Sequence, residues 1–146
     1  MNDRKSASGG HCVQSAEEIS ADWIAYSRYQ PNKAPKKVSE RGWVIYEKAQ
    51  DDPSMAWEAI KLTVKAYSVA DLFTDAETEA RGVISNIAAG PLEELLSHHG
   101  PVFIEKVETE ARIDRRMFWA LGCVWQNSMA DDIWQRVRRA AGEISR

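Results

Sequence analysis

Two Gly-Pro steps, Gly90-Pro91 and Gly100-Pro101, constrain the fold of this chain more than any other feature. Glycine ends helices well because it accepts a left-handed backbone just past the last turn. Proline suits the first turn of a helix, where its missing N–H is not needed. Asp114 and the run Ser128-Met129-Ala130-Asp131 are further helix-start signals in the same half of the chain. The pattern predicts short helices with almost no linkers, which must run antiparallel or cross at steep angles.

The first half of the chain carries similar signals. Ser15-Ala16-Glu17-Glu18 and Thr74-Asp75-Ala76-Glu77 have capping-box spacing, Asp52-Pro53 places a carboxylate before a first-turn proline, and Ser39 is the predicted cap of another helix. Trp43-Val44-Ile45-Tyr46 is a β-like run, but it is short. We therefore predict an all-α fold of about eight short helices packed as antiparallel helical hairpins, either HEAT-like or an irregular bundle. No fixed repeat period supports a true solenoid.

The length of 146 residues suits one domain, and the six tryptophans supply material for a core. Each indole side chain can bury on the order of 200 Å², so we predict that the tryptophans fill the interior. Met1–Gln14 is polar and is predicted to be a flexible tail. Residues 15–146 are then a single all-helical domain.

Charge and cysteine content give weaker indications of the protein's partners and cellular location. The net charge is −3, but Asp71–Glu110 is markedly acidic. This segment is either a set of solvated helix faces or an acidic face for a basic partner. Two cysteines favour a reducing, cytoplasmic setting, with Cys123 as a buried apolar thiol. Since no run approaches the ~18 apolar residues of a membrane span, we expect no membrane contact.

Two histidines beside two glutamates suggest a metal site. Glu94 and His98 have the i,i+4 spacing of helical metal ligands, whereas Glu93 lies on another face. A third ligand would have to come from elsewhere, such as Glu105 or Asp131. The favoured interpretation is structural, with the imidazoles bonding helix carbonyls near Gly100.

A second candidate set spans a predicted helix–turn–helix joint: Trp125, Asn127, Met129, Asp131 and Trp134. Its polar and aromatic side chains suit the rim of a protein interface, because tryptophan is enriched at binding hot spots. The structural alternative is that Asn127 adopts the left-handed conformation, Ser128 or Asp131 caps the next helix and the indoles fill the core.

The last predicted helix is basic, and its arginines raise the alternative of nucleic-acid binding. These residues are Arg136, Arg138, Arg139 and Arg146. Neighbouring acidic residues dilute the charge, so we expect no nucleic-acid partner. No Gly-rich phosphate loop or G-x-S-x-G elbow occurs, and we expect neither catalytic residues nor a cofactor.

Three stretches of the second half carry a family pattern. They are Ala88-Ala89-Gly90-Pro91-Leu92-Glu93-Glu94-Leu95-Leu96 with His99-Gly100; Phe103-Ile104-Glu105-Lys106-Val107-Glu108 with Ala111-Arg112; and Val124-Trp125-Gln126-Asn127-Ser128-Met129 with Asp131 and Trp134. The pattern resembles a family of small bacterial proteins labelled only as a domain of unknown function. The resemblance covers roughly residues 20–140 and implies a bacterial origin and a compact helical domain. It implies no activity, substrate or cofactor.

The sequence thus favours a non-catalytic protein–protein interaction module, an adaptor or a neutralising partner. Its candidate contact residues are Glu93, Glu94, His98, His99, Glu105, Trp125, Asn127, Asp131 and Trp134. The first alternative is a small metal-dependent enzyme using Glu94, His98 and His99, and the second is nucleic-acid binding through the C-terminal arginines. The oligomeric state is left open.

Overall fold

The computed structural model describes residues 14–143, and within this range the chain forms nine α-helices, one π-helical turn and no strand. The elements are α1 (Ala16–Ser27), α2 (Lys36–Gly42), α3 (Val44–Asp51), α4 (Pro53–Lys65), α5 (Val69–Leu72), α6 (Glu79–Ile87), η1 (Ala88–Leu92), α7 (Glu93–Ile113), α8 (Arg115–Leu121) and α9 (Asp131–Ala140). The all-α prediction is confirmed. The predicted tail falls almost wholly on residues 1–13, outside the described residues.

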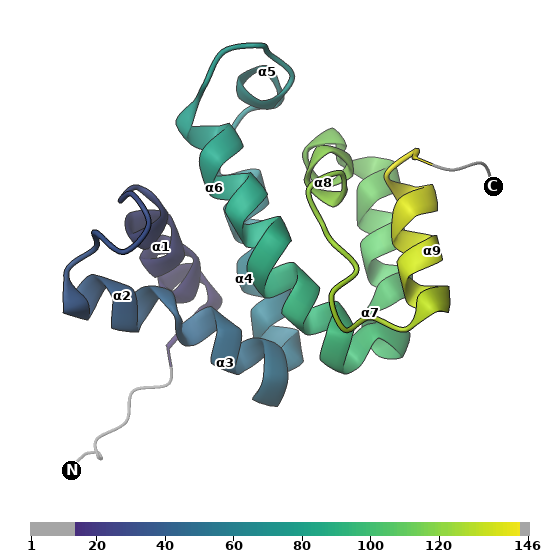
Figure 1. The fold of residues 1–146 in the computed structure, drawn as a ribbon, viewed down its shortest axis with the longest axis horizontal. Coiled ribbons are helices and arrows are strands. Elements are labelled where there is room, and N and C mark those ends of the chain that lie inside the picture. The colour runs from purple at the N-terminus through teal and green to yellow at the C-terminus, as the bar shows by residue number, and fades with distance from the viewer. Residues whose placement is uncertain (1–13, 144–146) are drawn as a thin grey trace.

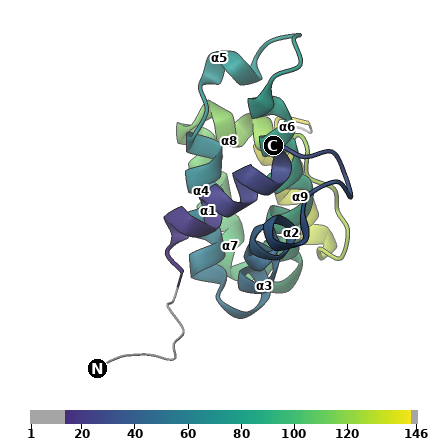
Figure 2. The same cartoon turned by 90° about the vertical axis from the view of Figure 1, so that its left-hand side faces the viewer.

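The helices form an irregular bundle rather than a regular HEAT-like stack (Figures 1 and 2). Helices α1, α2 and α3 lie on one side, α4 and α6 in the middle, and α7, α8 and α9 on the other side. Helix α1 packs against α2 and α4, while α8 and α9 both pack against α7. Between Gln14 and Glu143, no helix combines the length and apolar character needed to cross a membrane.

One hydrophobic core links the helices, and every helix except α2 contributes an apolar side chain to it. Trp23 and Trp57 are buried, at 3% and 4% exposed, so the predicted tryptophan core is correct for these two. It is wrong for Trp43 and Trp125, which are 50% and 73% exposed. Helical spacing places a side chain on a face, but only the neighbouring helices decide whether that face is covered.

The two Gly-Pro steps do not end helices as predicted. Helices α6, η1 and α7 follow one another without a linker, and Gly90-Pro91 lies inside the π-helical turn. Gly100-Pro101 lies within α7, where the backbone kinks at His99 (φ −134°, ψ 29°). Proline interrupts the hydrogen-bond ladder, and here the chain responds with a wide turn and a kink instead of a stop. In the described part of the chain, the one glycine with a left-handed backbone is Gly142 (φ 75°).

Gly90 is required by packing rather than by its backbone conformation. A Cβ atom at Gly90 would overlap the hydroxyl oxygen of Tyr46 and lie 3.0 Å from its Cζ atom. Tyr46 belongs to α3, so the side chain of an earlier helix rests directly on the backbone of the π-helical turn. This contact fixes α3 against the start of α7.

Three of the predicted helix starts are confirmed. The hydroxyl of Ser15 accepts a hydrogen bond from the backbone N–H of Glu18 (3.1 Å), and the Glu18 carboxylate accepts one from the backbone N–H of Ser15 (2.9 Å). Pro53 is the first residue of α4, although the predicted capping carboxylate of Asp52 makes no side-chain cap bond. The Asp114 carboxylate accepts from the backbone N–H of Arg116 (2.9 Å). Each signal acts within three residues, which is why the sequence predicts it reliably.

Other predicted starts are wrong. Helix α6 begins after Thr78, whose hydroxyl accepts from the Arg81 N–H, and not after Thr74. Ser39 lies inside α2, and the β-like run that starts at Trp43 forms the joint between two helices. Neither Ser128 nor Asp131 caps α9, because Ala130 occupies the cap position without a side-chain bond. Several hydroxyl residues compete near each start, and local spacing does not rank them.

Candidate interaction surface

A buried carboxylate connects the first turn of α7 to the loop between α8 and α9. Glu93 is 6% exposed, and its Oε2 atom accepts a hydrogen bond from the backbone N–H of Trp125 (3.0 Å). The side chain of Asn127 also hydrogen-bonds to it. Burial raises the pKa of Glu93, and these two hydrogen bonds oppose that rise. The structure thus brings together three predicted site residues, but Glu93 is too buried to meet a partner directly.

The loop of residues 122–130 is held at further points. Asn127 adopts the predicted left-handed backbone (φ 49°), and Met129 is buried at 4% exposed. The side-chain amide of Gln126 donates to the carboxylate of Asp131 (2.8 Å). Trp134 is half-buried against the core and presents little of its ring. The loop therefore presents the indole of Trp125 from a backbone that is fixed on both sides.

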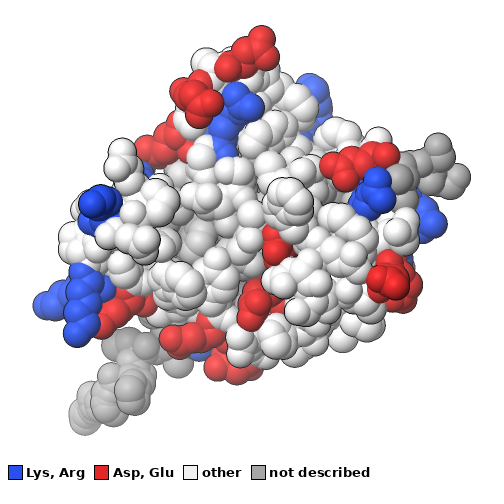
Figure 3. All heavy atoms as spheres, in the orientation of Figure 1, with Lys and Arg blue, Asp and Glu red and all other residues white. Residues whose placement is uncertain are grey.

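The face that carries this loop is poor in charge. In the orientation of Figure 3, most Lys, Arg, Asp and Glu side chains lie around the edge, and the middle of the face is uncharged apart from acidic side chains near its centre. The loop between α8 and α9 runs across this face, as a comparison with Figure 1 shows. Exposed tryptophan on an uncharged surface is typical of the centre of a protein interface.

Glu94 pairs with His98, whereas His99 does not contact Glu94 and bonds the backbone of Gln50. Glu94 Oε2 accepts from the side-chain amide of Gln50 (2.8 Å) and lies 3.2 Å from His98 Nε2. His99 Nε2 instead lies 2.8 Å from the backbone carbonyl of Gln50, near the end of α3. The predicted bonding of the imidazoles to the last carbonyls of their own helix is not observed, because α7 continues past Gly100 and His99 contacts a carbonyl of α3. Among residues 14–143, no three His, Cys, Asp or Glu residues are grouped so that they would hold a metal ion.

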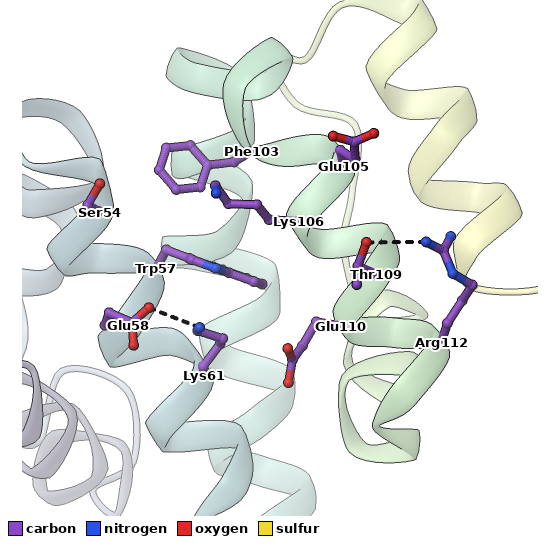
Figure 4. A pocket seen from close by; sticks show the side chains of 10 residues that line it. All are labelled: Ser54, Trp57, Glu58, Lys61, Phe103, Glu105, Lys106, Thr109, Glu110 and Arg112. Atoms are coloured by element: carbon purple, nitrogen blue, oxygen red, sulfur yellow. Dashed lines mark hydrogen bonds and ion pairs between the residues drawn. The ribbon is translucent and has the colours of Figure 1, made fainter.

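Glu105 lies in a different place, a groove of about 490 Å³ between α4 and α7 (Figure 4). Two buried aromatic side chains, Trp57 and Phe103, line the groove. Its remaining lining includes three carboxylates and three cations, and Lys61 pairs with Glu58 at 2.9 Å. Because charges of both signs alternate along the groove, it offers no clear preference for one class of ligand.

The acidic segment 71–110 does not form one free acidic face. Glu79 pairs with Arg28 (3.0 Å) and accepts from the hydroxyl of Tyr67 (2.6 Å). Glu110 lies 3.2 Å from the ammonium nitrogen of Lys65. Glu79 and Glu110 are therefore paired with cations of the same chain, and Glu93 is buried.

The C-terminal arginines are also partly neutralised. Arg136 donates to the carboxylate of Glu108 (2.8 Å), and Arg138 lies 3.8 Å from Glu143. Arg146 lies outside the described residues. Two of the arginines are therefore engaged by carboxylates of the same chain, which reduces the positive field available to a phosphate backbone.

A group of aromatic side chains was not predicted as a site. Trp23, Tyr26, Tyr29, Trp43 and Tyr46 line a cavity of about 270 Å³, here called the aromatic cavity. Trp23 with Tyr26, and Trp43 with Tyr46, are three residues apart in the sequence, and that spacing is equally typical of a buried helix face. The missed signal was the density of aromatic residues between positions 23 and 46.

Comparison with known proteins adds one result. Residues 30–144 match the family of unknown function DUF6869. This chain belongs to that family. The match spans most of the sequence, includes all nine predicted site residues and agrees with the resemblance to a domain of unknown function. No curated protein and no solved structure matches the chain.

Proposed function

We propose that this DUF6869 protein is a non-catalytic protein–protein interaction module, an adaptor or a neutralising partner. The observation that carries the proposal is Trp125, whose side chain is 73% exposed although its backbone is bonded to a buried carboxylate. A large aromatic side chain on a fixed backbone loses little conformational freedom on binding, which favours affinity. Such anchors account for much of the binding energy at protein interfaces.

The way in which the loop is held supports this interpretation. Burying a carboxylate without a cationic partner is unfavourable, and burial raises the pKa of Glu93 for this reason. A hydrogen bond from the backbone N–H of Trp125 partly offsets the unfavourable burial of the Glu93 carboxylate. The buried carboxylate thereby fixes the backbone of an exposed residue.

The enzyme alternative receives less support from the same region. His98 and His99 contact Glu94 and the Gln50 carbonyl respectively, and they do not converge on a shared point. Burial raises the pKa of the Cys123 thiol, which disfavours the reactive thiolate. These features agree better with a binding role than with nucleophilic or metal-assisted catalysis.

The test compares two variants that remove equally exposed apolar side chains. Trp125→Ala removes the proposed anchor, and Ile113→Ala, at a position 74% exposed at the end of α7, is the matched control. Both should unfold at nearly the wild-type temperature, since exposed substitutions usually cost less than about 0.5 kcal/mol. Tagged protein is used to capture proteins from an extract of its own cells, and each captured protein is purified and its affinity measured.

Support requires a protein whose affinity falls about 30-fold or more with Trp125→Ala but is unchanged with Ile113→Ala. If every captured protein binds both variants and the wild type equally, the proposal is wrong. Enzymatic turnover at the Glu94 and His98 region would also contradict it.

A further inference from the structure

The aromatic cavity lies between the helices of one side of the bundle and the central helix α6. Trp23 and Tyr26 come from α1, Trp43 from the joint of α2 and α3, Tyr46 from α3 and Asn86 from α6. None of the ten lining residues is charged. Its volume of about 270 Å³ is just below the ~300–1,000 Å³ of typical small-molecule sites. The size suits one large side chain of a protein partner.

The indole of Trp43 forms the exposed wall of this cavity, and the ring of Tyr46 supports one face of it. Its ring stacks on Tyr46, with centroids 4.5 Å apart and planes inclined by 26°. Tyr46 in turn contacts the ring of Trp23 (5.8 Å between centroids) and lies against Gly90. Trp43 is nevertheless 50% exposed. One face of the indole is supported by the protein, and the rest is available.

The outer side of the same indole is bordered by carboxylates. A second, open hollow of about 350 Å³ is lined by Ser39, Glu40, Trp43 and Glu47. Positions 40, 43 and 47 are three and four residues apart along the helical run of α2 and α3, which places them on one face. Lys36 lies 3.9 Å from Glu40, at the limit of an ion pair. Within the part of the chain that the structure describes, Glu47 makes no ion pair.

The charges near the cavity are of both signs. Residues 28–48 contain six Lys and Arg side chains against Glu40 and Glu47, while Glu93 and Glu94 add to the burial that raises the pKa of Tyr46 to about 12. The second hollow itself is lined by an indole and two carboxylates and by no cation, which makes it complementary to a cation. The cationic side chains at the start of α2 do not line either hollow.

We propose that the aromatic cavity and the carboxylates around Trp43 bind an arginine-bearing segment of a protein partner. The guanidinium lies over the exposed part of the Trp43 indole, and its N–H groups donate to Glu47 and Glu40. Arginine fits better than lysine because its planar, weakly hydrated group both stacks on aromatic rings and pairs with carboxylates. This inference rests on the proposed interaction function and specifies one chemical group that the partner contributes.

The experiment uses a capped peptide, acetyl-Gly-Gly-Arg-Gly-Gly-amide, and the same peptide with citrulline in place of arginine. Citrulline keeps the size and loses the charge. Binding to the full chain is followed by NMR through the indole N–H signals of Trp43 and Trp23. We expect saturable shifts at millimolar concentrations for the arginine peptide, and at least about five-fold weaker binding for citrulline.

Two variants test which charged side chains take part in arginine binding. Glu47→Gln keeps the size of an exposed side chain and should weaken arginine binding about three-fold or more. Lys36→Gln should strengthen it, because it releases Glu40 from its neighbouring ammonium group. Equal binding of the two peptides, or no effect of Glu47→Gln, would overturn the inference. If arginine binding is absent while partner capture still depends on Trp125, the further inference fails and the proposed function stands; if both are absent, both fail.

Discussion

The carboxylate of Glu93 and the backbone N–H of Trp125 are joined by a 3.0 Å hydrogen bond across 32 residues of sequence. The acceptor lies in the first turn of α7, directly after the π-helical turn, and the donor lies in the loop before α9. The bond couples a buried ionisable group to the position of the most exposed tryptophan. The stability of the loop and the presentation of Trp125 should therefore respond together to changes at Glu93.

Substitution of Glu93 tests this coupling. Glu93→Ala leaves the N–H of Trp125 and the side chain of Asn127 without their acceptor, and we expect a loss of about 1–3 kcal/mol in the free energy of unfolding. Glu93→Gln keeps an acceptor and removes the buried charge, so it should be at least as stable as the wild type at pH 7. Urea unfolding measures both, and a Glu93→Gln loss as large as that of Glu93→Ala would contradict the expected role.

The raised pKa of Glu93 also sets a direction for pH dependence. The folded protein holds the proton to a higher pH than the unfolded chain, whose ordinary value is 4.5. The contribution of Glu93 to stability is thus complete at low pH and is lost as the pH rises from 4.5 through the raised pKa. A series of unfolding measurements should show this loss in the wild type and a smaller one in Glu93→Gln. Identical pH profiles would show that the carboxylate is not desolvated.

The packing of Tyr46 on Gly90 predicts the effect of a single methyl group. Gly90→Ala would overlap the Tyr46 hydroxyl, and we expect it to lower stability by about 1–3 kcal/mol. Gly82→Ala is the control, because a Cβ atom there meets nothing within 4 Å. That change should stabilise α6 by about 0.5–1 kcal/mol. Tyr46→Phe should recover part of the loss in Gly90→Ala, and thermal unfolding of the four variants measures it.

The start of α6 gives a paired prediction. Thr78→Ala removes the acceptor for the Arg81 N–H (3.1 Å) and the donor to the Asp71 carbonyl (2.6 Å), and it should cost about 1 kcal/mol. Thr74→Ala removes only a bond to the Ala76 N–H in an exposed turn and should cost less than about 0.5 kcal/mol. Chemical denaturation ranks the two. The reverse order would place the helix start at Thr74.

Two tyrosines should ionise late. Burial is the main cause that raises the pKa of Tyr46 and of Tyr67 to about 12, and Glu79 adds to it for Tyr67. Since the unfolded value is 10.0, their contribution to stability is present below pH 10 and is lost as the pH rises towards 12. Spectrophotometric titration should lose one step near pH 12 in Tyr46→Phe and one in Tyr67→Phe. A Tyr67→Phe variant that loses a step near pH 10 instead would contradict the raised pKa of Tyr67.

The sequence alone predicted the features that depend on short-range contacts. The capping box at Ser15, the cap at Asp114 and the first-turn proline at Pro53 each act within three residues, so the chain carries the whole signal locally. The helical class follows from apolar spacing repeated along the chain. Even the left-handed Asn127 is a property of one residue and its backbone.

Tertiary structure decided the features that depend on contacts between different helices. Gly90 has the sequence signature of a helix end, yet its role comes from Tyr46, a residue of another helix. Trp23 and Trp43 both lie on apolar helical stripes, but Trp23 is buried against the ring of Tyr46 on α3, and nothing in residues 14–143 covers much of Trp43. The sequence places Glu93 among the candidate contact residues, but the loop after α8 covers it and makes it a buried acceptor. Burial and long-range hydrogen bonds depend on which segments meet in space, and the spacing of residues along one helix contains no record of that.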